Sequence, residues 1–229
     1  MKKDIFLVDA DNTILDFHAS SLLSLKKSFE KFGVEWREEY GTEFTRFNDY
    51  LWERLERKEI TRDELLSIRF PQYLKILGID TVDGEEFNRV FLHTLSLTPV
   101  YIEGAQEFLK TLRKNGRVVI VTNGTTNIQK SRFEICGLNE LVDGVFVSET
   151  IGYNKPAKEY TDYVLTHIDG FSKERAVWIG DSLSADIKAA KDANITCIWY
   201  NPDKKEVKED EKPDFYVDNF DKILRILGI

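Results

Sequence analysis

Hydrophobic residues are grouped along this chain in two ways, and each grouping predicts a different kind of structure. From Pro99 onward, short continuous apolar runs alternate with segments of helical periodicity, and a similar apolar run lies at residues 5–8. The pattern predicts strands at 5–8, 118–122, 145–148, 176–179 and 196–200, and helices at 104–115, 127–136, 158–167 and 184–193. Because the strands are continuously apolar, helices should cover both faces of the sheet. The expected fold class is α/β, with a doubly wound parallel sheet.

Residues 17–97 show helical periodicity and no convincing strand. One apolar face ends at Gly33 and is formed by Leu22, Leu25, Phe29 and Phe32. Further helices are expected around residues 50–55, 65–77 and 84–95. Thr61 and Glu64 form a capping-box pattern before the second of these. The sequence therefore predicts a core of residues 1–16 and 98–229, with an all-helical domain of residues 17–97 inserted after the first strand.

Composition limits the functions that this fold can serve. The chain has 229 residues, 42% of them hydrophobic, which is enough for a full core and a smaller accessory domain. Its formal net charge of −8 disfavours binding to nucleic acid polymers or anionic membranes, although local cations can still bind a small phosphorylated molecule. Cys136 and Cys197 are too few for a disulfide framework, and no apolar stretch approaches the ~18 residues of a membrane span. A cytoplasmic protein is expected, and the oligomeric state is left open. The mixed-charge run 203–212 is interpreted as a solvated loop.

Four polar segments follow predicted parallel strands, and they carry the candidate chemistry. They are Asp9-Ala10-Asp11-Asn12-Thr13, Thr122-Asn123-Gly124, Lys155-Pro156, and Gly180-Asp181 with Asp186 five residues later. Parallel strands present their carboxyl ends at one edge of the sheet, so these segments should converge there. Each segment alone is more often an ordinary turn, cap or surface feature, and the convergence of all four is what favours a catalytic site.

The residue types in these segments suit phosphoryl transfer from a monoester to water. A phosphate dianion repels a carboxylate, so a divalent cation is needed to bring the two together. Asp9 and Asp181 can supply hard oxygen ligands to Mg²⁺, and Asp11 can add its peptide carbonyl. Asp186 is expected either to bind the metal or to hold a metal ligand in place.

The same segments contain groups that could bind the phosphate and groups that could carry out the covalent step. Lys155 can supply a further positive charge, while the Thr122 hydroxyl and the Asn123 and Gly124 amides can donate to phosphoryl oxygens. Asp9 is the candidate nucleophile, which would form an aspartyl-phosphate. Asp11 is the candidate general acid and base, because it could reach the other side of the phosphorus.

Taken together and in this order, the four segments resemble the motifs of the haloacid dehalogenase superfamily, over essentially the whole chain. The resemblance implies a Rossmann-like core, Mg²⁺ dependence, an aspartate nucleophile and a movable helical cap inserted after the first motif. Asn12 stands where many members have glycine, and asparagine tolerates the same unusual backbone angles. The family's dehalogenases lack the second acid of the first motif, so Asp11 favours a phosphatase.

A narrower resemblance and two alternatives concern the substrate. Segments 51–61 and 69–70 of the insertion, with Gly180-Asp181-Ser182, are similar to the pyrimidine 5'-nucleotidase branch, which implies a nucleoside 5'-monophosphate as substrate. A sugar-phosphate phosphatase of the same superfamily is the alternative, and a phospho-acceptor signalling module is a more distant one. Within the insertion, Arg69 could meet the substrate and Trp52 could stack on a base, but both could equally be structural.

Overall fold

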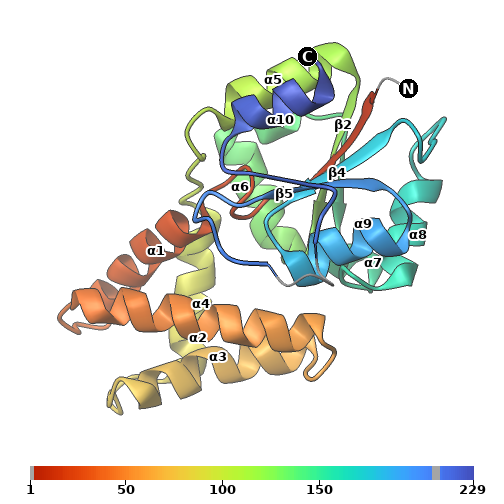
Figure 1. Cartoon of the computed structure of the whole chain (residues 1–229). Helices are drawn as coiled ribbons and strands as arrows, with labels where there is room; N and C mark the ends of the chain where they lie inside the picture. Colours follow the sequence, from red (N-terminus) through yellow and green to blue (C-terminus); the bar gives the residue numbers. More distant parts are fainter. Residues whose placement is uncertain (1–2, 208–211) are drawn as a thin grey trace. The chain divides into compact units, whose positions relative to one another are not determined.

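The chain divides into two compact units, each with its own core. The computed structural model describes residues 3–207 and 212–229. Residues 3–16 and the described part of 101–229 form an α/β unit, and residues 17–100 form a helical unit (Figure 1). The charged run expected at 203–212 lies partly outside the described residues, and 203–207 hold neither helix nor strand.

The α/β unit is built on one parallel sheet of six strands in the order β3-β2-β1-β4-β5-β6. The strands are β1 (Ile5–Val8), β2 (Arg117–Thr122), β3 (Gly144–Val147), β4 (Ala176–Gly180), β5 (Thr196–Tyr200) and β6 (Phe215–Val217). Val8 at the end of β1 pairs with Ile120 of β2 and Ile179 of β4. The strand order reverses beside β1, and ligands of open α/β sheets bind outside the carboxyl ends of strands at such a point.

Helices cover both faces of this sheet. They are α5 (Ala105–Asn115), α6 (Thr126–Cys136), α7 (Ser148–Ile151), α8 (Lys158–Thr166), α9 (Lys188–Asp192) and α10 (Phe220–Leu227), and short turns lie at Leu138–Glu140 (3₁₀) and Leu183–Ile187 (π). Phe6 and Val8 of β1 pack with α5, α6 and α10, whereas Ile5 and Leu7 pack with α8 and α9 (Figure 1). Successive strand residues point to opposite faces, so a continuously apolar strand is buried on both. The predicted doubly wound α/β fold is confirmed.

Four elements of this unit were not predicted: β6, α10, the single-turn helix α7 and the 3₁₀ turn Leu138–Glu140. One predicted helix differs in kind. β6 is three residues long with its first two side chains exposed, so its pattern gives no strand signal. α10 is short and amphipathic, with Phe220 and Ile223 buried. The helix predicted at 184–193 opens with the π-helical turn Leu183–Ile187 and continues as α9. Such turns are rare and are frequently found at functional sites.

The helical unit consists of α1 (Phe17–Lys31), α2 (Glu38–Glu56), α3 (Arg62–Ile76) and α4 (Gly84–Ser96). Its core is rich in aromatic rings contributed by all four helices, among them Phe29, Phe44, Phe70, Phe87 and Phe91. Ring centroids lie 4.8 Å apart for both the Phe29–Phe87 and the Phe70–Phe91 pairs, within the usual range for packed aromatic side chains. The unit therefore buries a core of its own.

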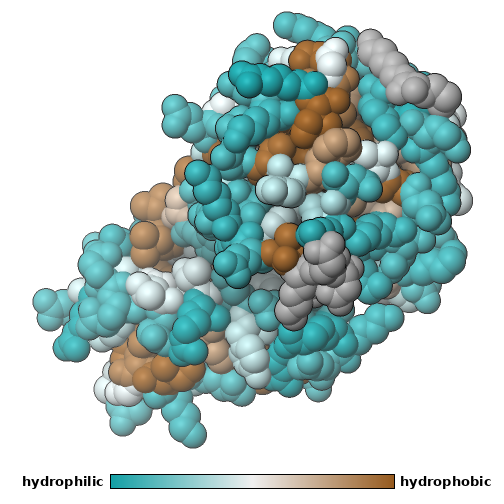
Figure 2. All heavy atoms as spheres, in the orientation of Figure 1, coloured by the Kyte–Doolittle hydropathy of each residue, from teal (hydrophilic) through white to brown (hydrophobic). Residues whose placement is uncertain are grey.

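Polar side chains dominate the part of the surface that Figure 2 displays, with smaller hydrophobic areas between them. This agrees with the high content of charged residues, 31% of the chain. Among the described helices, none combines the length and the apolar character that crossing a membrane requires.

The capping box at the start of α3 gives a direct test of this local structure. The Thr61 hydroxyl accepts from the Glu64 amide at 3.2 Å, and the Glu64 carboxylate accepts from the Thr61 amide at 2.7 Å. Thr61→Ala removes the side-chain acceptor, so we expect the free energy of unfolding to fall by about 0.5–2 kcal/mol. Urea denaturation followed by circular dichroism measures the change. Thr81→Ala, at an exposed position of the α3–α4 loop, is the control, and equal losses in both variants would contradict the prediction.

Candidate functional site

Three carboxylates meet at the carboxyl edge of the sheet. Asp9 follows β1 directly, and its amide donates to the Ile179 carbonyl at 2.9 Å, which continues the β1–β4 pairing. Asp181 follows β4, and Asp186 lies in the π-helical turn behind it. One carboxylate oxygen from each of these aspartates lies within 4.8 Å of the other two. The structure therefore brings together acids that are up to 177 positions apart in the sequence.

A buried lysine lies between two of these acids. Lys155 Nζ donates to Asp9 Oδ1 at 2.6 Å, to Asp186 Oδ1 at 2.7 Å and to the Val121 carbonyl at 2.8 Å. Burial lowers the pKa of Lys155, but the Asp186 and Asp9 carboxylates outweigh burial and raise the pKa above its ordinary value. The ammonium is therefore charged and holds both carboxylates in place.

Asp186 is fixed from several sides. Its Oδ1 also accepts from the indole of Trp178 at 3.1 Å, and its Oδ2 accepts from the Ser182 amide at 3.3 Å. A side chain at Gly180 would not fit, because a Cβ there would lie 2.3 Å from Asp186 Cγ. The glycine before Asp181 thus leaves the space into which the π-helical turn places Asp186.

The loop that carries Asp181 is held by side chains of other elements. The indole of Trp199 donates to the Asp181 carbonyl at 2.7 Å, and the Thr13 hydroxyl lies 3.5 Å from Asp181 Oδ1. The Asp181 side chain stays half-buried, unlike those of Asp9 and Asp186. This arrangement keeps one carboxylate of the group open to solvent.

The donor set fits a hard divalent cation. Burial raises the pKa of Asp9 to about 7, Lys155 opposes the rise, and Asp186 adds to it. Three carboxylates and one ammonium leave an excess of negative charge in a buried place. Carboxylate oxygens are the ligands that Mg²⁺ prefers, and a divalent cation would offset that excess.

The predicted phosphate-binding segment follows β2 on the same edge. Thr122 Oγ1 accepts from the Gly124 amide at 3.1 Å and from Gln129 Nε2 at 3.0 Å. The Asn123 side chain exchanges two hydrogen bonds with the backbone of Lys155, at 2.8 and 3.0 Å. Asn123 therefore anchors the segment that carries Lys155 to the end of β2.

Asp11 has partners that the sequence pattern did not reveal. Arg132 Nη1 donates to Asp11 Oδ1 at 2.6 Å, and Gln129 Nε2 donates to Asp11 Oδ2 at 2.8 Å. Both partners lie on α6, three residues apart and on one face of the helix. The sequence offered only the spacing of a glutamine and an arginine in a predicted helix, and it did not show that this face of the helix is buried. Asn12, next to Asp11, has a φ of +58°, in the left-handed region that asparagine tolerates.

The two candidate residues of the helical unit are placed differently. Arg69 is 2% exposed, and its guanidinium donates to Asn48 at 3.3 Å and to Asn88 at 2.9 Å. Burial lowers the pKa of Arg69 to about 9, and the guanidinium carbon lies 5.2 Å from the Phe91 ring centroid. Trp52 is half-buried, with the Arg62 guanidinium 5.9 Å from its ring centroid. The contacts of Arg69 are those of a core residue, and a contact of either residue with substrate stays a prediction.

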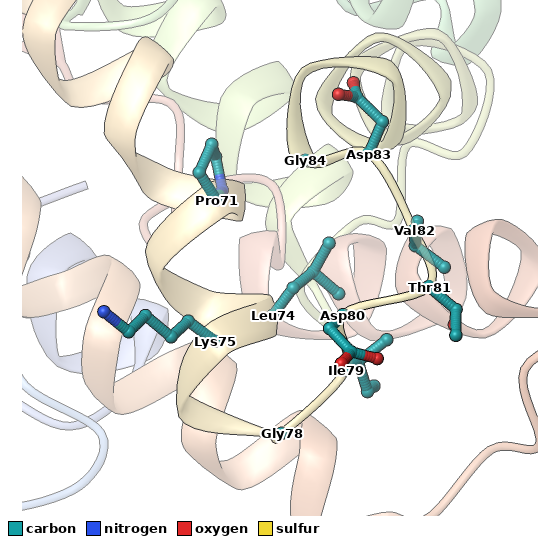
Figure 3. Close-up of a pocket in the computed structure, with 10 residues that line it drawn as sticks. All are labelled: Pro71, Leu74, Lys75, Gly78, Ile79, Asp80, Thr81, Val82, Asp83 and Gly84. Carbon is teal, nitrogen blue, oxygen red and sulfur yellow. The ribbon is translucent and has the colours of Figure 1, made fainter.

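A hollow of about 650 Å³ lies within the helical unit, between the end of α3 and the loop leading to α4 (Figure 3). Of the ten residues that line it, Leu74 alone is buried. Lys75 points away from the loop that carries Asp80 and Asp83 (Figure 3). The hollow therefore lacks a convergent set of polar groups and is no candidate for the chemistry.

Comparison with known proteins agrees with this geometry. Residues 3–194 match the family model described as haloacid dehalogenase-like hydrolase. The chain is 34% identical to the HAD-hydrolase YfnB of Bacillus subtilis, over 97% of this chain and 94% of that protein. It is 32% identical to the pyrimidine 5'-nucleotidase PynA of Streptococcus pneumoniae, over 96% and 93% of the two chains. It is 27% identical to the pyrimidine 5'-nucleotidase YjjG of Escherichia coli, over 99% of both.

The resemblance extends to the three-dimensional structure. The crystal structure of YfnB bound to magnesium superposes with a TM-score of 0.94 and covers 100% of both chains. The predicted resemblance to the pyrimidine 5'-nucleotidase branch is confirmed by the relatives of that name. The family model and the relatives that span nearly the whole chain show that this protein belongs to the haloacid dehalogenase superfamily of hydrolases.

Proposed function

We propose that this protein is a Mg²⁺-dependent phosphomonoesterase that acts on nucleoside 5'-monophosphates, with a preference for pyrimidines, through an aspartyl-phosphate on Asp9. One observation carries the proposal. The buried carboxylate of Asp9 lies beside a charged lysine and within reach of two further carboxylates, at the edge where open α/β sheets bind ligands. Phosphoryl transfer uses each of these groups, a carboxylate, a cation and a pair of metal-binding acids.

Asp9 is the nucleophile in this proposal. Its Oδ1 is held by Lys155, so the carboxylate is oriented before a substrate arrives. The lysine also offsets the repulsion between the carboxylate and an incoming phosphate dianion. Attack on phosphorus expels the alcohol and leaves the phosphoryl group on Asp9, and water then cleaves that acyl phosphate.

Mg²⁺ would be held by Asp9 and Asp181, with Asp186 either as a further ligand or holding Lys155 and the loop in place. The peptide carbonyl of Asp11 is a further candidate ligand. When bound, the ion supplies the positive charge that screens the phosphoryl oxygens from the carboxylates.

Thr122 and Asp11 complete the proposed machinery. The Thr122 hydroxyl and the backbone amide of Asn123 lie at the end of β2 and would donate to phosphoryl oxygens. Asp11 would give a proton to the departing alkoxide and then take one from the attacking water. Its side chain is 27% exposed, which leaves it accessible to a leaving group.

The substrate class rests on the relatives. PynA and YjjG are named pyrimidine 5'-nucleotidases, and the similarity covers most of each chain. We infer that the helical unit, predicted as a cap of residues 17–97, opens to admit the nucleotide and closes to exclude bulk water. The magnesium-bound crystal structure of YfnB reveals interdomain movement in that protein.

A substrate panel tests the activity. Purified protein should release phosphate from phosphomonoesters with Mg²⁺ and not with EDTA, and uridine and thymidine 5'-monophosphates should be cleaved faster than sugar phosphates. Asp9→Asn removes the nucleophile, so kcat should fall by about 10⁴-fold or more. Asp162→Asn, an exposed acid on α8, is the matched control and should retain activity. Faster cleavage of sugar phosphates would favour the alternative substrate class, and the absence of any Mg²⁺-dependent release would refute the phosphatase.

The two roles of Asp11 can be separated with an aryl ester. 4-Nitrophenol leaves as an anion without a proton, so Asp11→Asn should still be phosphorylated by 4-nitrophenyl phosphate and then hydrolyse slowly. We expect a rapid burst of about one equivalent of nitrophenol per protein, followed by a slow steady state. Stopped-flow absorbance measures the burst. Asp9→Asn should show no burst, and a slow steady state without a burst in Asp11→Asn would argue against the covalent intermediate.

The same experiment addresses the signalling alternative. A phospho-acceptor module would keep its phosphoryl group in the wild-type protein, whereas a phosphatase turns over many times. Multiple turnovers by the wild type would exclude the module.

A further inference from the structure

Two side chains of α6 form a cradle for Asp11. Arg132 Nη1 donates to Asp11 Oδ1 at 2.6 Å and to Gln129 Oε1 at 2.8 Å. Gln129 Nε2 donates to Asp11 Oδ2 at 2.8 Å. Each oxygen of the carboxylate thus has its own donor, and the two donors are bonded to one another. Two such contacts fix the plane of a carboxylate as well as its position.

The cradle is buried although the acid that it holds is accessible. Arg132 and Gln129 are each 1% exposed, whereas the Asp11 side chain is 27% exposed. Within the described part of the chain, Arg132 Nε and Nη2 find no hydrogen-bond partner. A buried cation with an incomplete set of acceptors does little for stability, because the cost of removing it from water is only partly offset. The arginine is therefore better explained by what it does to Asp11.

Gln129 also connects Asp11 to the proposed phosphate site. The same Nε2 that reaches Asp11 Oδ2 lies 3.0 Å from Thr122 Oγ1. Gly124 makes room for this side chain, because a Cβ at 124 would lie 2.5 Å from Gln129 Cγ. The geometry thus links the proposed phosphate-binding hydroxyl to the proposed acid through one amide.

We propose that Gln129 and Arg132 are positioning residues that aim the protonated Asp11 carboxyl group at the leaving oxygen and later aim its carboxylate at the attacking water. The inference rests on the proposed function, in which Asp11 transfers both protons. Asp11 belongs to a loop beside Asp9, and repulsion between the two acids would otherwise turn its carboxylate away. A small displacement of a proton-transfer group slows both transfers and leaves substrate binding almost unchanged.

Arg132→Met tests the inference with the aryl and alkyl esters together. It should lower kcat for an alkyl ester such as uridine 5'-monophosphate by about 10–100-fold, with KM changed much less. With 4-nitrophenyl phosphate it should give a nitrophenol burst, because formation of the phosphoenzyme needs no proton from Asp11, whereas its hydrolysis needs Asp11 to take a proton from the attacking water. A merely structural defect would lower both steps and give no burst. Arg132→Lys, which keeps the cation, should lose less activity.

Controls separate failure of the inference from failure of the proposed function. Lys130→Met removes a cation from the exposed face of the same helix and should behave as wild type. The double variant with Asp11→Asn should be no slower than Asp11→Asn alone, since both changes act through one group.

If Arg132→Met does not fold, Gln129→Met keeps the ion pair between Arg132 and Asp11 and should still give a burst. The inference would be overturned if the folded variants gave no burst, or if the losses of activity in the double variant were additive. In that case, turnover by the wild type would still support the proposed function. A wild type inactive on both esters would overturn both.

Discussion

The ion triplet of Lys155 with Asp9 and Asp186 is the interaction on which the rest of the site depends. All three side chains are buried, and the ammonium lies 2.6 and 2.7 Å from the two carboxylates. Removing Lys155 would leave two buried carboxylates without their cation, which is far more costly than losing a surface pair. The triplet also joins the ends of three strands, since Lys155 donates to Val121 of β2 and its partners follow β1 and β4. The same three side chains therefore hold the strand ends together and form the charged centre of the candidate site.

The balance of charge in this triplet accounts for the proposed metal. With Asp181 included, three carboxylates face one ammonium, and the pKa of Asp9 rises to about 7 because burial disfavours its charged form. A divalent cation would offset that penalty and favour the charged form of Asp9, which the proposed nucleophilic role requires. Asp11 forms its ion pair with a different cation, Arg132. Two acids one residue apart therefore occupy separate electrostatic settings, which suits a nucleophile and a proton-transfer group.

The sequence predicted the elements whose apolar residues form a continuous run or recur at regular spacing. Continuous apolar runs located β1, β2, β4 and β5 because both faces of these strands are buried. β6 was not predicted because an edge strand with two exposed side chains has no such run. α2 is longer than predicted, since its apolar stripe continues toward the amino terminus through Phe47, Phe44 and Tyr40. Parallel topology accounts for the polar segments after β1, β2 and β4, whereas Lys155 follows α7 and is anchored to the end of β2 by Asn123.

The cradle around Asp11 was beyond the reach of the same reasoning. Gln129 and Arg132 have the spacing of one helix face, but a polar pair at that spacing is usually exposed to solvent. Only packing shows that this face turns toward the sheet edge. For Arg69 the sequence left a substrate contact and a structural role equally open, and packing adds contacts of its guanidinium with Asn48, Asn88 and the Phe91 ring.

Chain connectivity explains why Asp11 needs a cradle at all. The loop after β1 runs directly into the connection to the helical unit, and the returning connection pairs with it, Leu15 with Tyr101 and the Ile14 carbonyl with the Ile102 amide at 2.9 Å. Any motion of the helical unit would pull on this paired segment, four residues from Asp11. Asp9 is shielded by its buried ion pair with Lys155, whereas Asp11 is partly exposed and closer to the connection. Contacts from α6, which belongs to the α/β unit, tie Asp11 to the sheet that carries Asp9, so that the two acids would keep their separation if the helical unit moved.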